Sequence, residues 1–175
     1  MKLKLTIIML LITGLLAACN DGSENASNDL APEELKQLIN DYSTGDGIGQ
    51  SASITATELV ITSNDNKKTV HDLPKDEFFV SIAPYMNVTH PCTNHSLTGC
   101  QGELVDRDID LYIEDEDGNV ILEDTMNTGK NGFIDLWLPR DQTYMVKMTY
   151  DGKEVESNIS TFDNDGTCIT TMQLI

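Results

Sequence analysis

Apolar and polar positions alternate through the second half of this chain with the period of two that marks half-buried β-strands. Ile109, Leu111 and Ile113 fall on one face of such a strand, and Asp108 and Asp110 fall on the other. Further strands are predicted at 120–122, 132–138 and 144–150, with tight turns at Asp117-Gly118 and Asp151-Gly152. The pattern therefore predicts an antiparallel β-sandwich.

The first half carries one helical pattern before it also turns to strands. Pro32 suits a first helical turn, and the apolar residues after it repeat with helical spacing. That stripe comprises Leu35, Leu38, Ile39 and Tyr42, and the glycines at 45, 47 and 49 end it. Strands are then predicted at 53–61, 68–73 and 77–83, the first two forming a hairpin around the turn-rich segment 63–66. The expected fold class is mainly β (α+β).

The N-terminus has the pattern of an export signal. Lys2 and Lys4 precede an apolar run, 5–16, that is too short to be assigned as a membrane-spanning helix. The run ends in Leu16-Ala17-Ala18-Cys19, which resembles a bacterial lipobox and implies cleavage before Cys19 and lipid attachment to its sulfur. Residues 1–18 are thus predicted to be a lipoprotein signal peptide and 19–28 a lipidated tether. An ordinary signal peptide, or a membrane helix that ends in cysteine, is the alternative.

The chain is strongly acidic, with a formal net charge of −18. Binding to nucleic acid requires Lys and Arg to displace counterions from phosphates, so the charge excludes nucleic acid as a partner class. Cations are attracted to such a surface. Because the acidic residues are spread over loops and strand faces, solubility accounts for most of them.

One short loop concentrates the side chains that can carry chemistry. It contains His90, Cys92, His95 and Cys100, and the only other cysteine beyond the predicted anchor is Cys168. Thiolate and imidazole bind soft or borderline metals, and thiolate-rich sites favour Cu(I) or Zn. Three cysteines are an odd number in an exported protein, so at least one thiol needs a role other than an internal disulfide. The loop therefore points to metal or thiol chemistry.

The residue pattern leaves two other arrangements open. In one, a Cys92–Cys100 disulfide is structural and Cys168 is buried in the core, which would suit a surface β-sandwich that acts as a binding or scaffold module. In the other, the three cysteines and one histidine form a structural zinc site. His95 and His90 are candidate ligands or neighbours of the ligands, because imidazole suits Cu(II) when it first binds. His71 is expected at the surface.

Motifs distributed over most of the chain help to choose between a copper site, a structural disulfide and a zinc site. They are Phe78–Tyr85, Thr89-His90-Pro91-Cys92, His95–Thr98, Cys100–Leu104, Gly132-Phe133, Leu136–Pro139, Thr167-Cys168 and Thr170-Thr171. Together they resemble the CueP family of exported bacterial copper-binding proteins. The resemblance implies copper binding outside the cytoplasm by Cys92, Cys100 and Cys168, with reduction of Cu(II) to Cu(I).

The stretch from Asp117 to Lys153 also resembles small transthyretin-like β-sandwich modules, which bears on the fold alone. The chain is thus expected to have a short N-terminal helix and β-hairpin region, 29–88, followed by the cysteine loop and a C-terminal antiparallel transthyretin-like β-sandwich, 89–175.

The predicted protein is an extracytoplasmic copper-binding lipoprotein of the cell envelope. Its expected partners are copper as Cu(I) or Cu(II), the membrane through the lipid anchor, and a thiol reductant or copper-accepting protein; zinc is the alternative metal. Two thiolates can each give one electron to Cu(II) and close as a disulfide, which is a stoichiometric reaction. The motifs of hydrolases are absent from the sequence.

Overall fold

The computed structural model describes residues 30–45 and 49–175. The predicted signal peptide and tether, including Cys19, lie outside the described residues. None of the helices within the described ranges is long and apolar enough to cross a membrane.

Helix α1, Pro32–Thr44, confirms the helical pattern of the first half. Proline stands in its first turn, and the Ala31 N–H donates to Glu34 Oε2 at 3.3 Å, which satisfies a backbone donor at the start of the helix. Gly45 ends the helix with a φ of 89°, a left-handed conformation that glycine adopts without steric cost. The buried face of α1 carries Leu35, Ile39 and Tyr42.

The strands next to α1 form a four-stranded sheet in the order β3-β2-β1-β5. Their bounds are β1 Ser51–Ile54, β2 Glu58–Thr62, β3 Lys68–Asp72 and β5 His95–Ser96. The prediction of one strand over 53–61 is wrong, because a turn separates β1 from β2. Thr55 Oγ1 accepts hydrogen bonds from the N–H groups of Thr57 at 3.3 Å and Glu58 at 3.0 Å. These side-chain hydrogen bonds form a turn in place of continued strand pairing. The predicted hairpin is formed by β2 and β3.

The rest of the chain forms a β-sandwich, as the alternating pattern predicts. One sheet has the order β10-β9-β6-β7 and the facing sheet β11-β4-β8. The bounds are β4 Glu77–Ile82, β6 Asp108–Asp115, β7 Val120–Asn127, β8 Ile134–Pro139, β9 Thr143–Tyr150, β10 Lys153–Ser160 and β11 Cys168–Ile169. Ile109, Leu111 and Ile113 are at most 2% exposed and lie in the core between the two sheets. The pairing is antiparallel except between β11 and β4, which run parallel.

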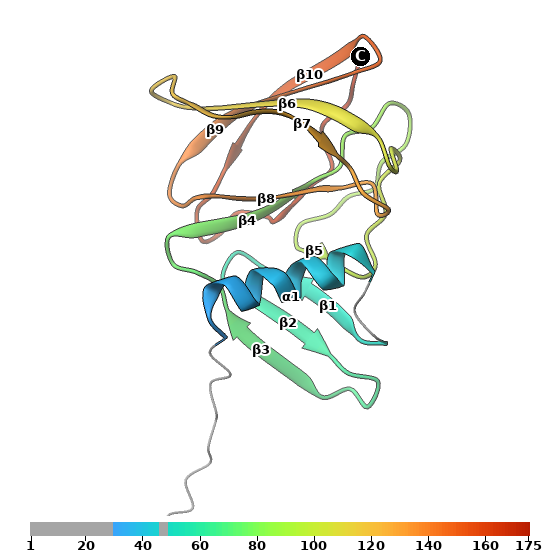
Figure 1. The fold of residues 1–175 in the computed structure, drawn as a ribbon, viewed down its shortest axis with the longest axis vertical. Helices are drawn as coiled ribbons and strands as arrows, with labels where there is room; N and C mark the ends of the chain where they lie inside the picture. Colours follow the sequence, from blue (N-terminus) through green and yellow to red (C-terminus); the bar gives the residue numbers. More distant parts are fainter. Residues whose placement is uncertain (1–29, 46–48) are drawn as a thin grey trace, which may run out of the picture.

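The β4–β8 layer is covered on both faces (Figure 1). Phe78 and Val80 pack into the sandwich core, whereas Phe79 packs with residues of α1, β1 and β2. Ser81 shares the face of Phe79, since alternate residues of a strand point the same way. The prediction of a mainly β fold with one short helix is confirmed.

Candidate metal centre

Three cysteine sulfurs meet beside the β4–β8 layer. The Sγ atoms of Cys92, Cys100 and Cys168 all lie within 4.8 Å of one another, and those of Cys92 and Cys100 are 3.7 Å apart. No disulfide joins any of the three. Within the described part of the chain, they form the only group of three or more His, Cys, Asp or Glu side chains close enough to hold one metal ion.

Parallel pairing of β11 with β4 brings the distant cysteine to the loop. Cys168 lies opposite Ser81 in the register, and the Ser81 N–H donates to Thr167 O at 2.8 Å. The Cys168 N–H in turn donates to Thr93 O, at 3.0 Å, in the loop that carries Cys92. Two backbone hydrogen bonds therefore fix the third sulfur relative to the other two.

The spacing of the sulfurs suits a metal ion better than it suits a disulfide. With metal–sulfur bonds of about 2.3 Å, three sulfurs in a trigonal plane are separated by about 4.0 Å. The separations here, 3.7 Å for one pair and at most 4.8 Å for the others, need only small side-chain adjustments to reach that value. A disulfide needs a sulfur–sulfur distance of about 2.05 Å. The donor set is therefore a fit for a soft ion in a low-coordinate sulfur site.

The surroundings of Cys168 and Cys100 favour the protonated form of these two thiols. Ala83 and Phe133 pack against the three cysteines, and Cys168 is only 4% exposed. Burial raises the pKa of the Cys168 thiol far above its usual value. Burial also raises the pKa of Cys100, although the Ser96 N–H, 3.4 Å from its sulfur, acts in the opposite direction. Binding of a metal at this cluster therefore competes with protons.

His95 lies next to the cluster and is completely buried. Its ring centroid is 4.6 Å from that of Phe133, which packs on the cysteines. Burial lowers the pKa of His95 to about 4, more than the nearby Asp135 charge raises it. Nε2 lies 3.3 Å from Ser81 Oγ, whereas Nδ1 is buried and has no hydrogen-bond partner.

His90 also lies near this aromatic ring, with 6.4 Å between the ring centroids of His90 and Phe133. Its Nε2 is also buried without a hydrogen-bond partner. The ring nitrogens of His90 and His95 are not part of the group of ligand atoms that lie within 4.8 Å of one another. The structure therefore brings the three predicted cysteines together and leaves both predicted histidines around Phe133. His71, which was expected at the surface, is instead 7% exposed, because it points inward from β3.

Two polar residues behind His95 are absent from the sequence-based candidates. Ser81 donates to Asp135 Oδ1, and Asp135 Oδ2 accepts from Ser43 of α1. Asp135 is the one charged residue within the otherwise apolar run 132–138. A charge within an otherwise apolar strand is the sequence signal that could have indicated these hydrogen bonds, because a charge that is even partly removed from water is usually hydrogen-bonded.

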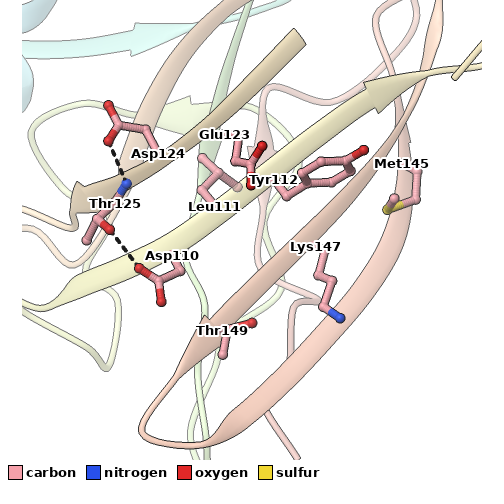
Figure 2. Close-up of a pocket in the computed structure, with 9 residues that line it drawn as sticks. All are labelled: Asp110, Leu111, Tyr112, Glu123, Asp124, Thr125, Met145, Lys147 and Thr149. Atoms are coloured by element: carbon pink, nitrogen blue, oxygen red, sulfur yellow. Dashed lines mark hydrogen bonds between the residues drawn. The ribbon is translucent and has the colours of Figure 1, made fainter. Parts of the chain in front are cut away.

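A groove lies away from the cysteines, on the outer face of β6, β7 and β9 (Figure 2). It encloses about 610 Å³ and is lined by polar and charged side chains, among them Asp110, Glu123 and Lys147. Thr125 Oγ1 donates to Asp110 at 2.7 Å across its floor, as Figure 2 shows. None of the predicted site residues lines this groove.

Comparison with known proteins identifies the family of this chain. The family model described as "Periplasmic copper-binding protein CueP" matches residues 35–173, which include all three clustered cysteines. The chain belongs to the CueP family. The CueP structure titled "Crystal Structure of S.CueP" is 37% identical, has a TM-score of 0.76, and aligns over 81% of this chain and 88% of that chain. The comparison with curated proteins gives no match.

The resemblance to CueP in the sequence motifs is thus confirmed. CueP proteins are copper-binding proteins found outside the cytoplasm, so copper is the metal that the family assigns to this chain. The cluster of three cysteines is a donor set capable of holding it.

Proposed function

We propose that this protein sequesters Cu(I) outside the cytoplasm by coordinating it with Cys92, Cys100 and Cys168. The observation that carries the proposal is the meeting of three sulfurs, within 4.8 Å of one another, in an otherwise apolar cluster. Cu(I) is a soft ion that is satisfied by two or three thiolates, and an apolar shell limits access of water and oxidants.

The same cluster can reduce Cu(II). Cys92 and Cys100 each give one electron to a Cu(II) ion, both thiols lose their protons, and their sulfurs form one disulfide bond while two Cu(I) ions are produced. The 3.7 Å between their sulfurs makes this closure a short movement. A thiol reductant must then supply two electrons to reopen the disulfide, so the reaction is stoichiometric without one. His95 and His90 are proposed to lie in or beside the coordination shell when copper arrives.

We further propose that Cys19 carries a lipid that anchors the protein to an envelope membrane, since Leu16-Ala17-Ala18-Cys19 has the composition of a lipobox. The protein then works at the membrane surface, with a thiol reductant or a copper-accepting protein as its partner.

The proposal is tested by anaerobic titration of Cu(I) into the reduced protein against a competing chelator. Cys92→Ser, Cys100→Ser and Cys168→Ser are each expected to weaken Cu(I) binding by at least about tenfold, or 1.4 kcal/mol. Met172→Leu is the matched control, because this buried sulfur lies in the sandwich core and its loss should leave the affinity unchanged.

Three outcomes would contradict the proposal. An unchanged affinity in Cys168→Ser would remove the distant strand from the site. Two thiols that stay unreactive in the folded, unreduced protein and ignore copper would favour a scaffold module with a structural Cys92–Cys100 bridge. Tight retention of zinc through purification, with unfolding on chelation, would favour a structural zinc site.

A further inference from the structure

A partly buried chain of hydrogen bonds leads from α1 to the ring of His95. Ser43 of α1 and Ser81 of β4 each donate a hydroxyl proton to one oxygen of Asp135 on β8. Ser81 Oγ also lies 3.3 Å from His95 Nε2. Asn131 Nδ2 donates to Ser43 Oγ at 3.2 Å at the far end. Ser81 and His95 are both completely buried, so water does not compete for the contact between them.

The direction of each bond in this chain is fixed by how many protons each group has. A carboxylate has no proton to donate, so both serine hydroxyls must donate to Asp135. Ser81 has only one hydroxyl proton, and once that proton points at Asp135 its oxygen can only accept. His95 Nε2 must therefore be the donor in its contact with Ser81, and a neutral imidazole with its proton on Nε2 has its lone pair on Nδ1.

We propose that Ser81 and Asp135 are positioning residues that hold His95 in the Nε2–H tautomer, so that Nδ1 is the nitrogen that His95 offers to copper. This inference rests on the proposed function, and it names the donor atom and the residues that prepare it.

The burial of Nδ1 and its lack of a hydrogen-bond partner support this assignment. A buried polar atom without such a partner is uncommon in folded proteins and calls for a reason. The His95 N–H donates to Thr167 Oγ1 at 3.0 Å, one residue before Cys168, so the backbone of His95 is fixed beside the third cysteine. A carboxylate that orients a histidine through the nitrogen not used for the metal is a recurrent arrangement around metal ligands, and here a serine hydroxyl relays it.

The tautomer can be read directly in the apo protein. Long-range ¹H–¹⁵N correlation spectra of the reduced, metal-free protein distinguish the Nε2–H, Nδ1–H and doubly protonated forms of each histidine. At neutral pH the wild-type protein is expected to show His95 only as the Nε2–H form. An Nδ1–H or a doubly protonated His95 would overturn the proposal.

Three substitutions separate positioning from general packing. Ser81→Ala and Asp135→Asn should each give a mixture of His95 tautomers. Ser81→Ala removes the oxygen that accepts from Nε2, and Asp135→Asn removes the carboxylate that obliges the Ser81 hydroxyl to donate away from Nε2. Ser43→Ala is the matched control: it removes the other donor to Asp135 but leaves the Ser81 contact, so the Nε2–H form should persist. Retention of a pure Nε2–H form in both Ser81→Ala and Asp135→Asn, each folded by circular dichroism, would overturn the role of these residues.

A second arm adds Cu(I), which is diamagnetic and leaves the spectra interpretable. Loading with one equivalent should shift the His95 Nδ1 resonance strongly while the Nε2–H signal is kept. Copper bound by the cysteines with no change at Nδ1 would overturn the assignment of the donor atom. Absence of Cu(I) binding altogether would instead contradict the proposed function, so the two failures are distinguishable.

Discussion

At the scale of single residues, burial of the His95 ring couples the stability of the fold to pH. The pKa of His95 is lowered from 6.5 to about 4 in the folded chain, mainly by desolvation. Between these two values the unfolded chain takes up a proton that the folded chain does not, so the free energy of unfolding falls as pH drops from 6.5 towards 4. Between pH values above 6.5 and below 4, this one group changes the free energy of unfolding by about 3 kcal/mol.

Urea denaturation of the metal-free protein across this pH range measures the effect. His95→Gln should flatten the pH dependence relative to the wild type, since the carboxylates that also titrate there are common to both. Parallel curves for the two proteins would contradict a neutral, buried His95.

Two glycines beside the cluster mark a close backbone approach. Gly132 has a φ of +78°, and a Cβ on it would lie 2.8 Å from the backbone of Gly102, two residues after Cys100. Gly132→Ala is therefore expected to destabilise the fold by about 1–2 kcal/mol for the left-handed conformation and by about 1–3 kcal/mol more for the clash.

Gly152→Ala is the matched control for Gly132→Ala. Its φ is +74°, but a Cβ there meets nothing within 4 Å, so only the conformational cost should remain. The midpoints of urea unfolding report both costs. Equal losses of stability in the two variants would show that the close approach of Gly102 to Gly132 adds no cost to the substitution.

At the scale of elements, Thr167 is hydrogen-bonded to three strands beside the cysteine cluster. Its buried hydroxyl donates to Ile54 O of β1 at 2.7 Å and accepts from the His95 N–H of β5 at 3.0 Å, while its carbonyl pairs with β4. Thr167→Val leaves both partners without their hydrogen bond, which costs about 1–3 kcal/mol for each buried group. Chemical denaturation should show this loss. Thr125→Val, which removes an exposed hydroxyl bonded to Asp110, should change stability by less than about 0.5 kcal/mol.

The elements differ in how far the sequence could predict them. The helix at Pro32–Thr44 and the long alternating strands β6 and β9 follow from periodicity, since each carries a repeated apolar face. The break between β1 and β2 is set by one threonine hydroxyl, which β-propensity does not register. β5 and β11 have two residues each and are strands only because their neighbours are in place.

The residues of the site also differ in how far the sequence could predict them, depending on whether their contacts are local or long-range. Cys92 and Cys100 could be grouped from their spacing in one loop. The contribution of Cys168 came from the resemblance to CueP, because nothing near residue 168 records its pairing with β4. Ser81 and Asp135 were not among the candidates, since Ser81 counted only as part of a strand and of the motif Phe78–Tyr85, and Asp135 only as part of a strand.

At the scale of the whole molecule, copper binding should stabilise the fold. The three proposed ligands come from the loops before and after β5 and from β11, so the complete set exists only when these segments are folded. A free Cu(I) concentration of 100 times the dissociation constant would raise the free energy of unfolding by about 2.7 kcal/mol. Thermal unfolding under anaerobic, Cu(I)-buffered conditions measures this. Cys168→Ser should show a smaller shift, and an equal shift in both proteins would mean that the distant strand takes no part.

The most direct test of the three-sulfur centre is X-ray absorption at the copper edge on the Cu(I)-loaded protein. We expect three sulfur neighbours per copper at about 2.3 Å in the wild type and two in Cys168→Ser. Two or fewer sulfur neighbours in the wild type, or the same number in both proteins, would contradict the account.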